Sequence, residues 1–198
     1  IAICKKYDRI EKLFIPLPNM DTDILEIEGL RFVKAVSAEQ LDMITSRLAD
    51  RINQDYAGRE VVFLVVLNGA FMFASDLLKK IEGVHTVCFI KVSTYSGMQS
   101  SGEYKEVIGL TQELKDRDVV IIEDIVDSGF TMKEMLERLK EQDARSVEVC
   151  ALAFKPDNFK GDYEVKYKGL NMGAEFIVGY GLDFEQKGRN LKEIYKKI

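Results

Sequence analysis

The sequence predicts a single α/β domain built on an open, mostly parallel, twisted sheet flanked by helices. Two apolar runs without alternation, at residues 61–67 and 119–122, are typical of strands covered on both faces of a parallel sheet. Segments with helical periodicity stand between such runs, as in right-handed βαβ units. The chain has 198 residues, 46% of them hydrophobic and 31% charged, and contains no linker or internal repeat. Residues 1–198 are therefore interpreted as one domain.

The first helix is predicted within residues 37–58. Ser37 and Gln40 have the spacing of a capping box, and Gly58 is suited to end the helix. Between these residues the apolar side chains recur at helical spacing, at Leu41, Ile44, Leu48 and Ile52.

The later elements alternate in the same way. Thr131 and Glu134 have the spacing of a second capping box, so a helix is expected to begin there. After the strand at 61–67 we expect, in chain order, a helix over 70–81, strands over 84–95 and 119–122, the helix from Thr131, strands over 146–155 and 174–182, and a terminal helical turn over 191–198.

Cysteine placement, apolar run length and net charge limit the classes of protein to which this chain can belong. Cys4, Cys88 and Cys150 are widely spaced and two of them lie in apolar runs, which predicts reduced thiols in a cytoplasmic protein and neither a disulfide frame nor a zinc site. No signal segment is visible, and no apolar run has the roughly 20 residues of a membrane span. The formal charge of −5 and the pI of about 5.1 argue against a non-specific nucleic-acid binder.

Residues 96–106 form the one conspicuous loop, with serines, glycines and charges and few bulky groups. A loop of this length in a compact domain predicts a flexible active-site lid, and a plain exposed excursion is the alternative.

Polar clusters follow four of the predicted strands at their carboxyl ends. They are Asn68-Gly69, Thr94-Tyr95, the segment 123–131 and Lys155. Because ligands of open α/β sheets bind beyond the carboxyl ends of the strands, these clusters are expected to line one crevice.

The segment 123–131 has the features of a phosphate and polyol site. A small turn at 127–131 leads into a helix N-terminus, where backbone N–H groups and the hydroxyls of Ser128 and Thr131 suit an anionic phosphate. Glu123 and Asp124 suit a pair of vicinal hydroxyls or the water shell of magnesium. Together these groups describe a ribose 5-phosphate, although the same bare pattern occurs in flavodoxin-like signalling domains and in simple helix capping.

The run VVIIEDIVDSGFTM resembles the phosphoribosyl diphosphate (PRPP) signature of type I phosphoribosyltransferases. The runs LVVLNGAFMFASDL, FKPD and EFIVGYGLDF, the pair Thr94-Tyr95 and the later Arg189 are similar to the purine salvage branch of that family. The resemblance extends from about residue 61 to residue 191.

The resemblance implies an activity and an assembly. The reaction would transfer the 5-phosphoribosyl group from PRPP bound to Mg²⁺ to N9 of a 6-oxopurine, hypoxanthine or guanine, giving IMP or GMP and pyrophosphate. The fold would carry a small hood from the terminal segments, and the chain would form a homodimer or homotetramer. A cis bond at Leu67-Asn68 is typical of the family, and no role is assigned to residues 1–36.

The resemblance also assigns roles to individual residues. Asp127 would transfer the proton of the purine, Lys155 would donate to its 6-oxygen, and Thr94 and Tyr95 would close over the reaction. The remaining groups would bind the 5-phosphate (Asp127, Ser128, Gly129, Phe130 and Thr131), the ribose hydroxyls and metal (Glu123 and Asp124), the purine (Phe176, Ile177 and Asp183), the water shell of a second metal (Asp183 again), and pyrophosphate (Leu67, Asn68, Gly69 and Arg189).

Two positions depart from the family pattern. Asn68 stands where a lysine or arginine is common, and Phe130 stands where a polar or basic residue is frequent. Both put the strength of pyrophosphate and phosphate binding in question. Some proteins of this fold bind RNA or bind ligands without catalysis, and these remain the rival classes.

Without the resemblance, several of these residues have plain structural interpretations. Phe176 would be a core aromatic, Lys155 an ordinary loop lysine, and Asp183 with Arg189 part of a solvated face. His85, the only histidine, is interpreted as structural.

Overall fold

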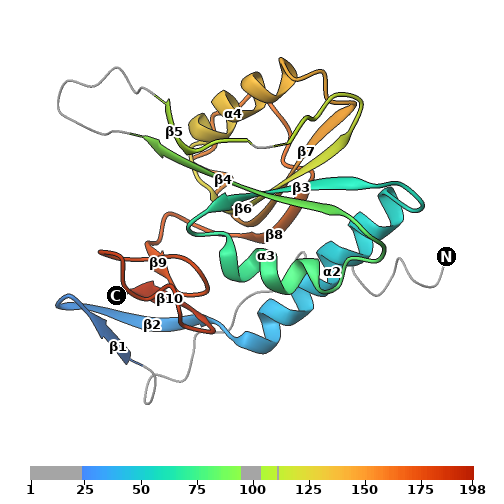
Figure 1. The fold of residues 1–198 in the computed structure, drawn as a ribbon. Coiled ribbons are helices and arrows are strands. Elements are labelled where there is room, and N and C mark those ends of the chain that lie inside the picture. The colour runs from blue at the N-terminus through green and yellow to red at the C-terminus, as the bar shows by residue number, and fades with distance from the viewer. Residues whose placement is uncertain (1–23, 95–103, 111) are drawn as a thin grey trace.

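The structure, a computed structural model, describes residues 24–94, 104–110 and 112–198. Its main sheet has six strands in the order β5-β4-β3-β6-β7-β8 (Figure 1). Neighbouring strands are parallel except for β5, which pairs antiparallel with β4 at one edge. The strands are β3 (Val61–Leu67), β4 (Thr86–Thr94), β5 (Tyr104–Ile108), β6 (Asp118–Val126), β7 (Ser146–Phe154) and β8 (Tyr167–Asn171). The predicted open parallel sheet is confirmed.

Helices cover both faces of this sheet. Helices α2 (Ala38–Asp55) and α3 (Phe71–Leu78) lie on one face, and α4 (Phe130–Lys140) lies on the other (Figure 1). Alternate residues of the central strands therefore belong to different cores. In β3, Phe63 and Val65 pack in the core that contains α2 and α3, whereas Val62 and Leu64 pack with the methionines of α4. Burial on both faces explains why β3 and the start of β6 are apolar without alternation.

The capping box of α2 is confirmed. The Ser37 side chain accepts a hydrogen bond from the Gln40 N–H at 3.3 Å, and the Gln40 side chain accepts one from the Ser37 N–H at 2.9 Å. All four predicted apolar positions of this helix are buried.

The capping box expected for α4 is wrong. The helix begins one residue earlier, at Phe130, and its N-cap is Gly129, which has φ 83° and makes no side-chain cap. A left-handed backbone at the cap suits glycine, and it leaves the first N–H groups of the helix without the hydroxyl partner that was expected.

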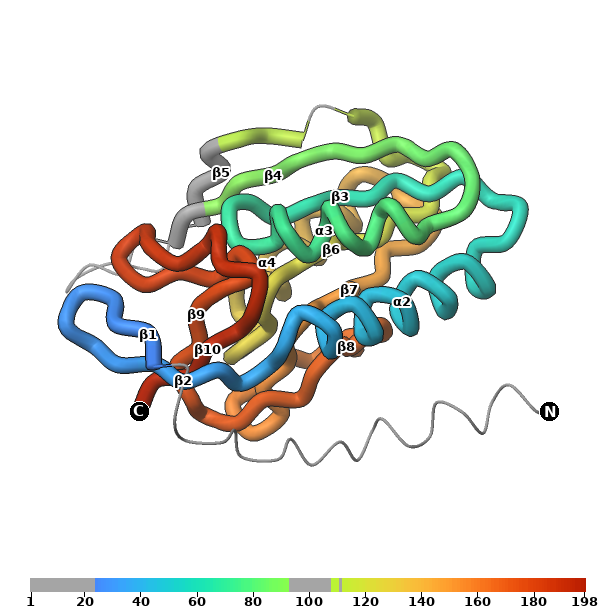
Figure 2. Tube along the Cα trace, turned by 90° about the horizontal axis from the view of Figure 1, so that it is seen from below, coloured from blue at the N-terminus to red at the C-terminus, as the bar shows by residue number. Residues whose placement is uncertain are grey.

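A second, four-stranded antiparallel sheet lies at the carboxyl edge of the main sheet (Figures 1 and 2). Its order is β1-β2-β10-β9, with β1 at Ile24–Ile27, β2 at Leu30–Val36, β9 at Ile177–Val178 and β10 at Ile194–Lys197. It confirms the expected hood from the terminal segments, and it gives part of the segment 1–36 a structural role.

This hood corrects two predictions. Residues 191–198 contain a strand instead of a helical turn, because β10 pairs with both β2 and β9. The strand expected over 174–182 is only β9, since a turn closed by the Gly179 and Leu182 bridge follows it. Strands β1, β2, β5 and β8 were not predicted.

Two further expectations concern the cysteines and the membrane. Cys88 and Cys150 are free and buried, as predicted, and Cys4 lies outside the described residues. Within the described ranges, no helix has the length and apolar character needed to cross a membrane.

Candidate active site

Three of the predicted polar clusters meet at the carboxyl edge of the main sheet. Asn68-Gly69 follows β3, Asp127 follows β6 and Lys155 follows β7, and these three strands are neighbours. Thr94 is the last residue of β4, whereas Tyr95 and most of the loop at 96–106 lie outside the described residues. The last three positions of that predicted loop, 104–106, belong to β5.

Asp127 is the centre of this edge. Lys155 Nζ lies 3.0 Å from Asp127 Oδ2, and Asn158 Nδ2 donates to Asp127 Oδ1 at 2.9 Å. Burial alone would raise the pKa of Asp127, but the hydrogen bonds from Asn158 and Lys155 outweigh it and lower the pKa below its ordinary value. The carboxylate is about half exposed, with a relative side-chain exposure of 46%, so an ionised acceptor is accessible at the carboxyl edge of the sheet.

The turn after Asp127 packs against a second segment, residues 159–163. The Lys160 N–H donates to the Ser128 carbonyl at 3.0 Å, and the Tyr163 hydroxyl donates to the Gly129 carbonyl at 3.0 Å. A Cβ atom at Gly129 would lie 2.6 Å from the Phe159 ring, so the turn packs directly on this ring. Burial, together with nearby carboxylates, raises the pKa of Tyr163 to about 12, which keeps its hydroxyl a donor. The turn is thereby held at the N-terminus of α4, where the helix dipole favours an anion.

Glu123 and Asp124 lie inside β6, which continues to Val126, four residues beyond the predicted end of the strand. Burial raises the pKa of Glu123 well above its usual value, and the charge of Asp124 adds to the rise. Burial also raises the pKa of Asp124, against the opposing influence of the Ile125 N–H and of Arg189. Ionisation of these two buried carboxyl groups is unfavourable, and a bound cation or hydrogen bonds from sugar hydroxyls would make it more favourable.

The turn after β3 approaches this acidic pair closely. The Leu67-Asn68 peptide bond is cis. A Cβ atom at Gly69 would lie 1.5 Å from Asp124 Oδ2, so only glycine leaves room for the carboxylate. On its other side the turn contacts the hood, because a Cβ atom at Gly181 would lie 1.9 Å from the Gly69 carbonyl oxygen. The expected pyrophosphate turn is therefore wedged between Asp124 and the hood.

Arg189 and Asp183 form an ion pair in the loop between β9 and β10 (residues 179–193), which we call the hood loop. The distance between Arg189 Nη2 and Asp183 Oδ1 is 2.7 Å. Arg189 also donates to the Gly181 carbonyl at 2.9 Å, which directs the guanidinium toward the part of the hood that contacts Gly69. The Gln186 N–H donates to Asp183 Oδ2 at 2.8 Å and fixes the other carboxylate oxygen. These two side chains, six positions apart, are thus brought together.

Phe176 presents its ring at the surface of the hood. It is 45% exposed and packs edge-on against Phe184, with the ring centroids 5.7 Å apart, and its other neighbour is the fully buried Phe32. Its position contradicts the plain interpretation as a core aromatic. Ile177, the first residue of β9, is buried and pairs with β10. Phe130 is 60% exposed at the first turn of α4.

Sequence reasoning missed several residues that complete this region. Asn158, Phe159 and Tyr163 contact the turn at 127–129 from a segment for which no prediction was made from the sequence. No local pattern marks Asn158. The aromatic spacing of Phe159 and Tyr163 after a conspicuous FKPD run was the available signal.

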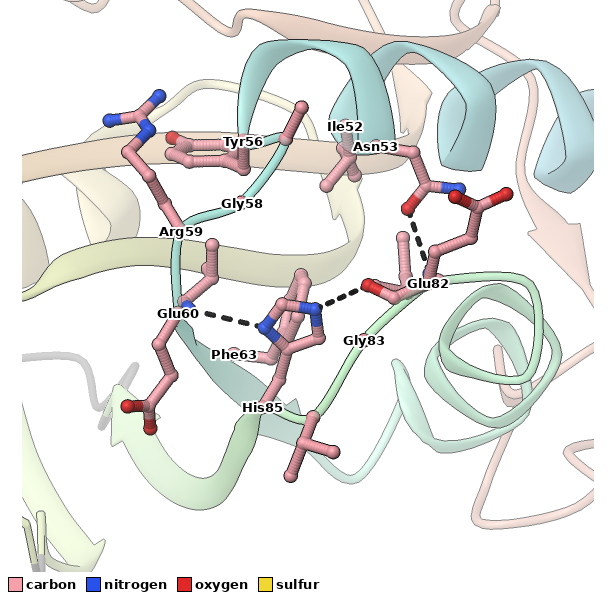
Figure 3. Close-up of a pocket in the computed structure, with 14 residues that line it drawn as sticks. Ile52, Asn53, Tyr56, Gly58, Arg59, Glu60, Phe63, Glu82, Gly83 and His85 are labelled. Atoms are coloured by element: carbon pink, nitrogen blue, oxygen red, sulfur yellow. Dashed lines mark hydrogen bonds between the residues drawn. The ribbon is translucent and has the colours of Figure 1, made fainter.

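A pocket of about 430 Å³ lies at the opposite, amino edge of the sheet, around His85 (Figure 3). His85 accepts a hydrogen bond from the Val61 N–H at 3.2 Å, and its other nitrogen donates to the Glu82 carbonyl at 2.8 Å. Asn53 uses both of its amide atoms on the backbone of residues 80 and 82. These polar groups have protein partners, which agrees with the structural interpretation of His85.

Known proteins share both the sequence and the shape of this chain. The family model of the phosphoribosyl transferase domain matches residues 34–185. The hypoxanthine-guanine phosphoribosyltransferase of Staphylococcus aureus is 38% identical over 160 residues, which cover 80% of this chain and 89% of the relative. The crystal structure of a hypoxanthine-guanine phosphoribosyltransferase from Bacillus anthracis is 34% identical with a TM-score of 0.78, covering 83% of this chain and 97% of that one.

A second solved structure agrees with the first. The hypoxanthine phosphoribosyltransferase from Staphylococcus aureus in its tetragonal crystal form has a TM-score of 0.80 at 34% identity and covers 90% of this chain and 96% of its own. The chain therefore belongs to the phosphoribosyltransferase family of type I, and within it to the hypoxanthine-guanine phosphoribosyltransferases.

Proposed function

We propose that this chain acts in purine salvage by transferring the 5-phosphoribosyl group of PRPP to N9 of hypoxanthine or guanine, with release of pyrophosphate. The observation that carries the proposal is the contact of Lys155 with Asp127 at 3.0 Å, directly beside a turn built for an anion. A donor and an acceptor so placed match the 6-oxygen and the imidazole edge of a 6-oxopurine.

Recognition of the purine rests on groups that follow β6, follow β7 and lie at the start of β9. Lys155 donates to the 6-oxygen, and adenine is disfavoured because its exocyclic amino group is itself a donor. Phe176 stacks on the ring and Ile177 reads its edge through main-chain groups, since its side chain is buried. Asp127 accepts the proton that the base gives up as its nitrogen bonds to the sugar.

The sugar phosphate occupies the segment 123–131. The N–H groups and hydroxyls of residues 127–131, Ser128 and Thr131 among them, bind the 5-phosphate, and Gly129 lets the backbone approach it. Glu123 and Asp124 accept hydrogen bonds from the ribose hydroxyls. The exposed Phe130 side chain has no role in this proposal.

Pyrophosphate leaves toward the turn at Leu67, Asn68 and Gly69. Asn68 carries no charge, so binding relies on backbone N–H groups and on Arg189, whose guanidinium lies in the hood loop that touches this turn. Arg189 balances the negative charge that develops on the leaving group.

Magnesium fits the acidic residues at this edge. Burial raises the pKa values of Glu123 and Asp124, so a bound cation would stabilise their ionised forms, and Asp183 is proposed as a further oxygen donor. In proteins Mg²⁺ is usually held by one or two carboxylates together with substrate phosphates and water, and the pair Glu123 and Asp124 suits that role. When bound, the ion would neutralise charge on the pyrophosphate.

Thr94 and Tyr95 keep their proposed place at the base of a lid formed by the loop at 96–106. An oxocarbenium-like sugar reacts with water, so such a lid would protect it. Only Thr94 of this pair lies within the described residues.

The chain is also proposed to form a homodimer or homotetramer in the cytoplasm. Large apolar side chains are exposed on the α3 side of the β4 edge of the main sheet: Phe71 (42%), Val87 (42%), Phe89 (50%) and Ile108 (42%). By register, Val87 and Phe89 stand beside Phe63 and Val65 on the face that α3 covers only in part. Such a patch is typical of protein interfaces.

A stoichiometry experiment tests the reaction. The purified protein is mixed with Mg²⁺, PRPP and hypoxanthine, and IMP and pyrophosphate are measured separately. Equal amounts of both products are expected, with loss of both when a chelator removes the metal. Pyrophosphate release without IMP would instead describe a PRPP hydrolase, and the proposal would fail.

A further inference from the structure

The segment 155–163 supports the turn at 127–129 residue by residue. Its side chains hold both carboxylate oxygens of Asp127, its backbone binds Ser128 and its Tyr163 hydroxyl binds Gly129. Two of these side chains bond to Asp127, the proposed catalytic group. Within the described residues, Asn158 is the neutral one of the two and Lys155 is the charged one. Asn158 is itself half-buried and is held in place by its N–H, which donates to the Lys155 carbonyl at 3.2 Å.

We propose that Asn158 is a positioning residue, which anchors Asp127 Oδ1 so that Oδ2 is the oxygen that takes the proton of the purine. The inference rests on the proposed function. Lys155 occupies Oδ2 at 3.0 Å, but the same ammonium is needed at the 6-oxygen of the base. When Lys155 turns to the base, Oδ2 is freed, and the bond from Asn158 at 2.9 Å keeps the carboxylate from rotating.

The electrostatics of the carboxylate agree with this division. Lys155 and Asn158 face Asp127 from the segment after β7. Against the effect of burial, the hydrogen bond from Asn158 and the hydrogen bond and charge of Lys155 each lower the pKa of Asp127. Tyr163 and Lys160 contact the turn through Gly129 and Ser128 and make no bond to this carboxylate. The hydrogen bond from Asn158 therefore still stabilises the ionised form of Asp127 when Lys155 is drawn away.

Replacement of Asn158 by leucine tests the proposal, because leucine keeps the volume and removes the donor. We expect kcat with hypoxanthine to fall by about fivefold, the effect of one ordinary hydrogen bond, while KM for PRPP stays within about twofold. Asn158→Ser, which restores a donor, should recover part of kcat. Asn171→Leu is the matched control, since Asn171 is exposed at the end of β8, and it should leave kcat unchanged.

A second measurement reads the carboxylate without turnover. A ¹³C NMR titration of the Asp127 carboxyl, assigned with Asp127→Asn, should show a higher midpoint in Asn158→Leu than in the parent chain. A purely structural role would lower the thermal midpoint, lower kcat, raise KM and leave this titration unmoved. An unchanged midpoint overturns the inference. If the parent chain shows no turnover with any base while the midpoint does shift, the proposed function fails and the contact between Asn158 and Asp127 stands.

Discussion

Asp127 is suited to proton transfer because its surroundings keep it ionised and leave it accessible. One oxygen bonds to an amide and the other to an ammonium, and nearly half of the side chain remains exposed. Its neighbours Glu123 and Asp124 have the opposite character, since burial raises their pKa values. These three carboxylates lie within five positions of one another but differ in role. Asp127 is suited to accept a proton, and Glu123 and Asp124 are suited to bind hydroxyls and a cation.

The Asp127→Asn variant should lose kcat by about 10²-fold to 10⁴-fold, the usual contribution of a general acid or base. PRPP binding should change much less, because the N–H groups of the turn remain. Steady-state kinetics and calorimetric titration of PRPP measure the two effects. Asp157→Asn is the control, since Asp157 is an exposed neighbour of the same segment, and full turnover by Asp127→Asn would contradict the assigned role.

Gly69→Ala probes the narrow space beside Asp124. The new Cβ would lie 1.5 Å from Asp124 Oδ2, so the carboxylate must move. We expect kcat/KM for PRPP to fall at least about tenfold, as a displacement of about 1 Å costs in a positioned site. Gly173→Ala is the control, because its Cβ would meet only the flexible end of Glu175. Equal activity of both variants would show that Asp124 has no such restriction.

Secondary-structure elements with local sequence signals were predicted well, whereas strands that depend on distant partners were not. The boundaries of β3 were predicted to the residue and those of α2 within its cap and stop, because apolar burial and the capping box are local signals. Strand β10 was mistaken for a helical turn because its partners, β2 and β9, lie far from it or are only two residues long. Gly129 replaced the expected Thr131 cap because the turn packs on aromatic rings, which no spacing rule records.

The cap of α2 provides a stability test away from the site. Ser37→Ala removes one side of the capping box and should lower the free energy of unfolding by about 1 kcal/mol. Urea unfolding measures this loss, and kcat should not change. A loss of activity with unchanged stability would mean that this helix end communicates with the site, which the structure gives no reason to expect.

The hood is tied to α3 by a bond whose strength depends on pH. Tyr180, which is buried, donates to Asp76 Oδ2 at 2.8 Å. Burial opposes ionisation of Asp76, but bonds from Lys79 and Tyr180 outweigh it and lower its pKa. A lowered folded-state pKa stabilises the protein above the unfolded value, near 3.9, and this stabilisation is lost as the pH falls through the folded value.

Tyr180→Phe should therefore destabilise the chain by about 0.5–1 kcal/mol at neutral pH, the low end for a hydrogen bond because Asp76 is partly exposed. The difference from the parent chain should shrink as the pH is lowered below about 4. Urea unfolding at several pH values measures it. A difference that stays constant down to the acid end would show that the bond is not linked to ionisation of Asp76.

In the whole molecule, the candidate site lies where the six-stranded main sheet meets the four-stranded hood. Parallel strands β3, β6 and β7 bring Asn68, Asp127 and Lys155 together, and their shared edge made that cluster predictable from sequence. The hood adds Phe176 and the ion pair of Asp183 with Arg189, which only the family resemblance located. Its contact with the main sheet, through Gly181 and Gly69, joins residues over a hundred positions apart, and no local pattern encodes such a contact.

We propose that the residues where the main sheet meets the hood select 6-oxopurines and join them to the sugar of PRPP. The most direct test offers hypoxanthine, guanine, xanthine, adenine and uracil separately to the purified chain with Mg²⁺ and PRPP, and follows nucleotide formation. We predict turnover of hypoxanthine or guanine and none of adenine or uracil. Turnover of adenine, or no turnover of any base while PRPP still binds, would contradict the claim and favour a different or regulatory role.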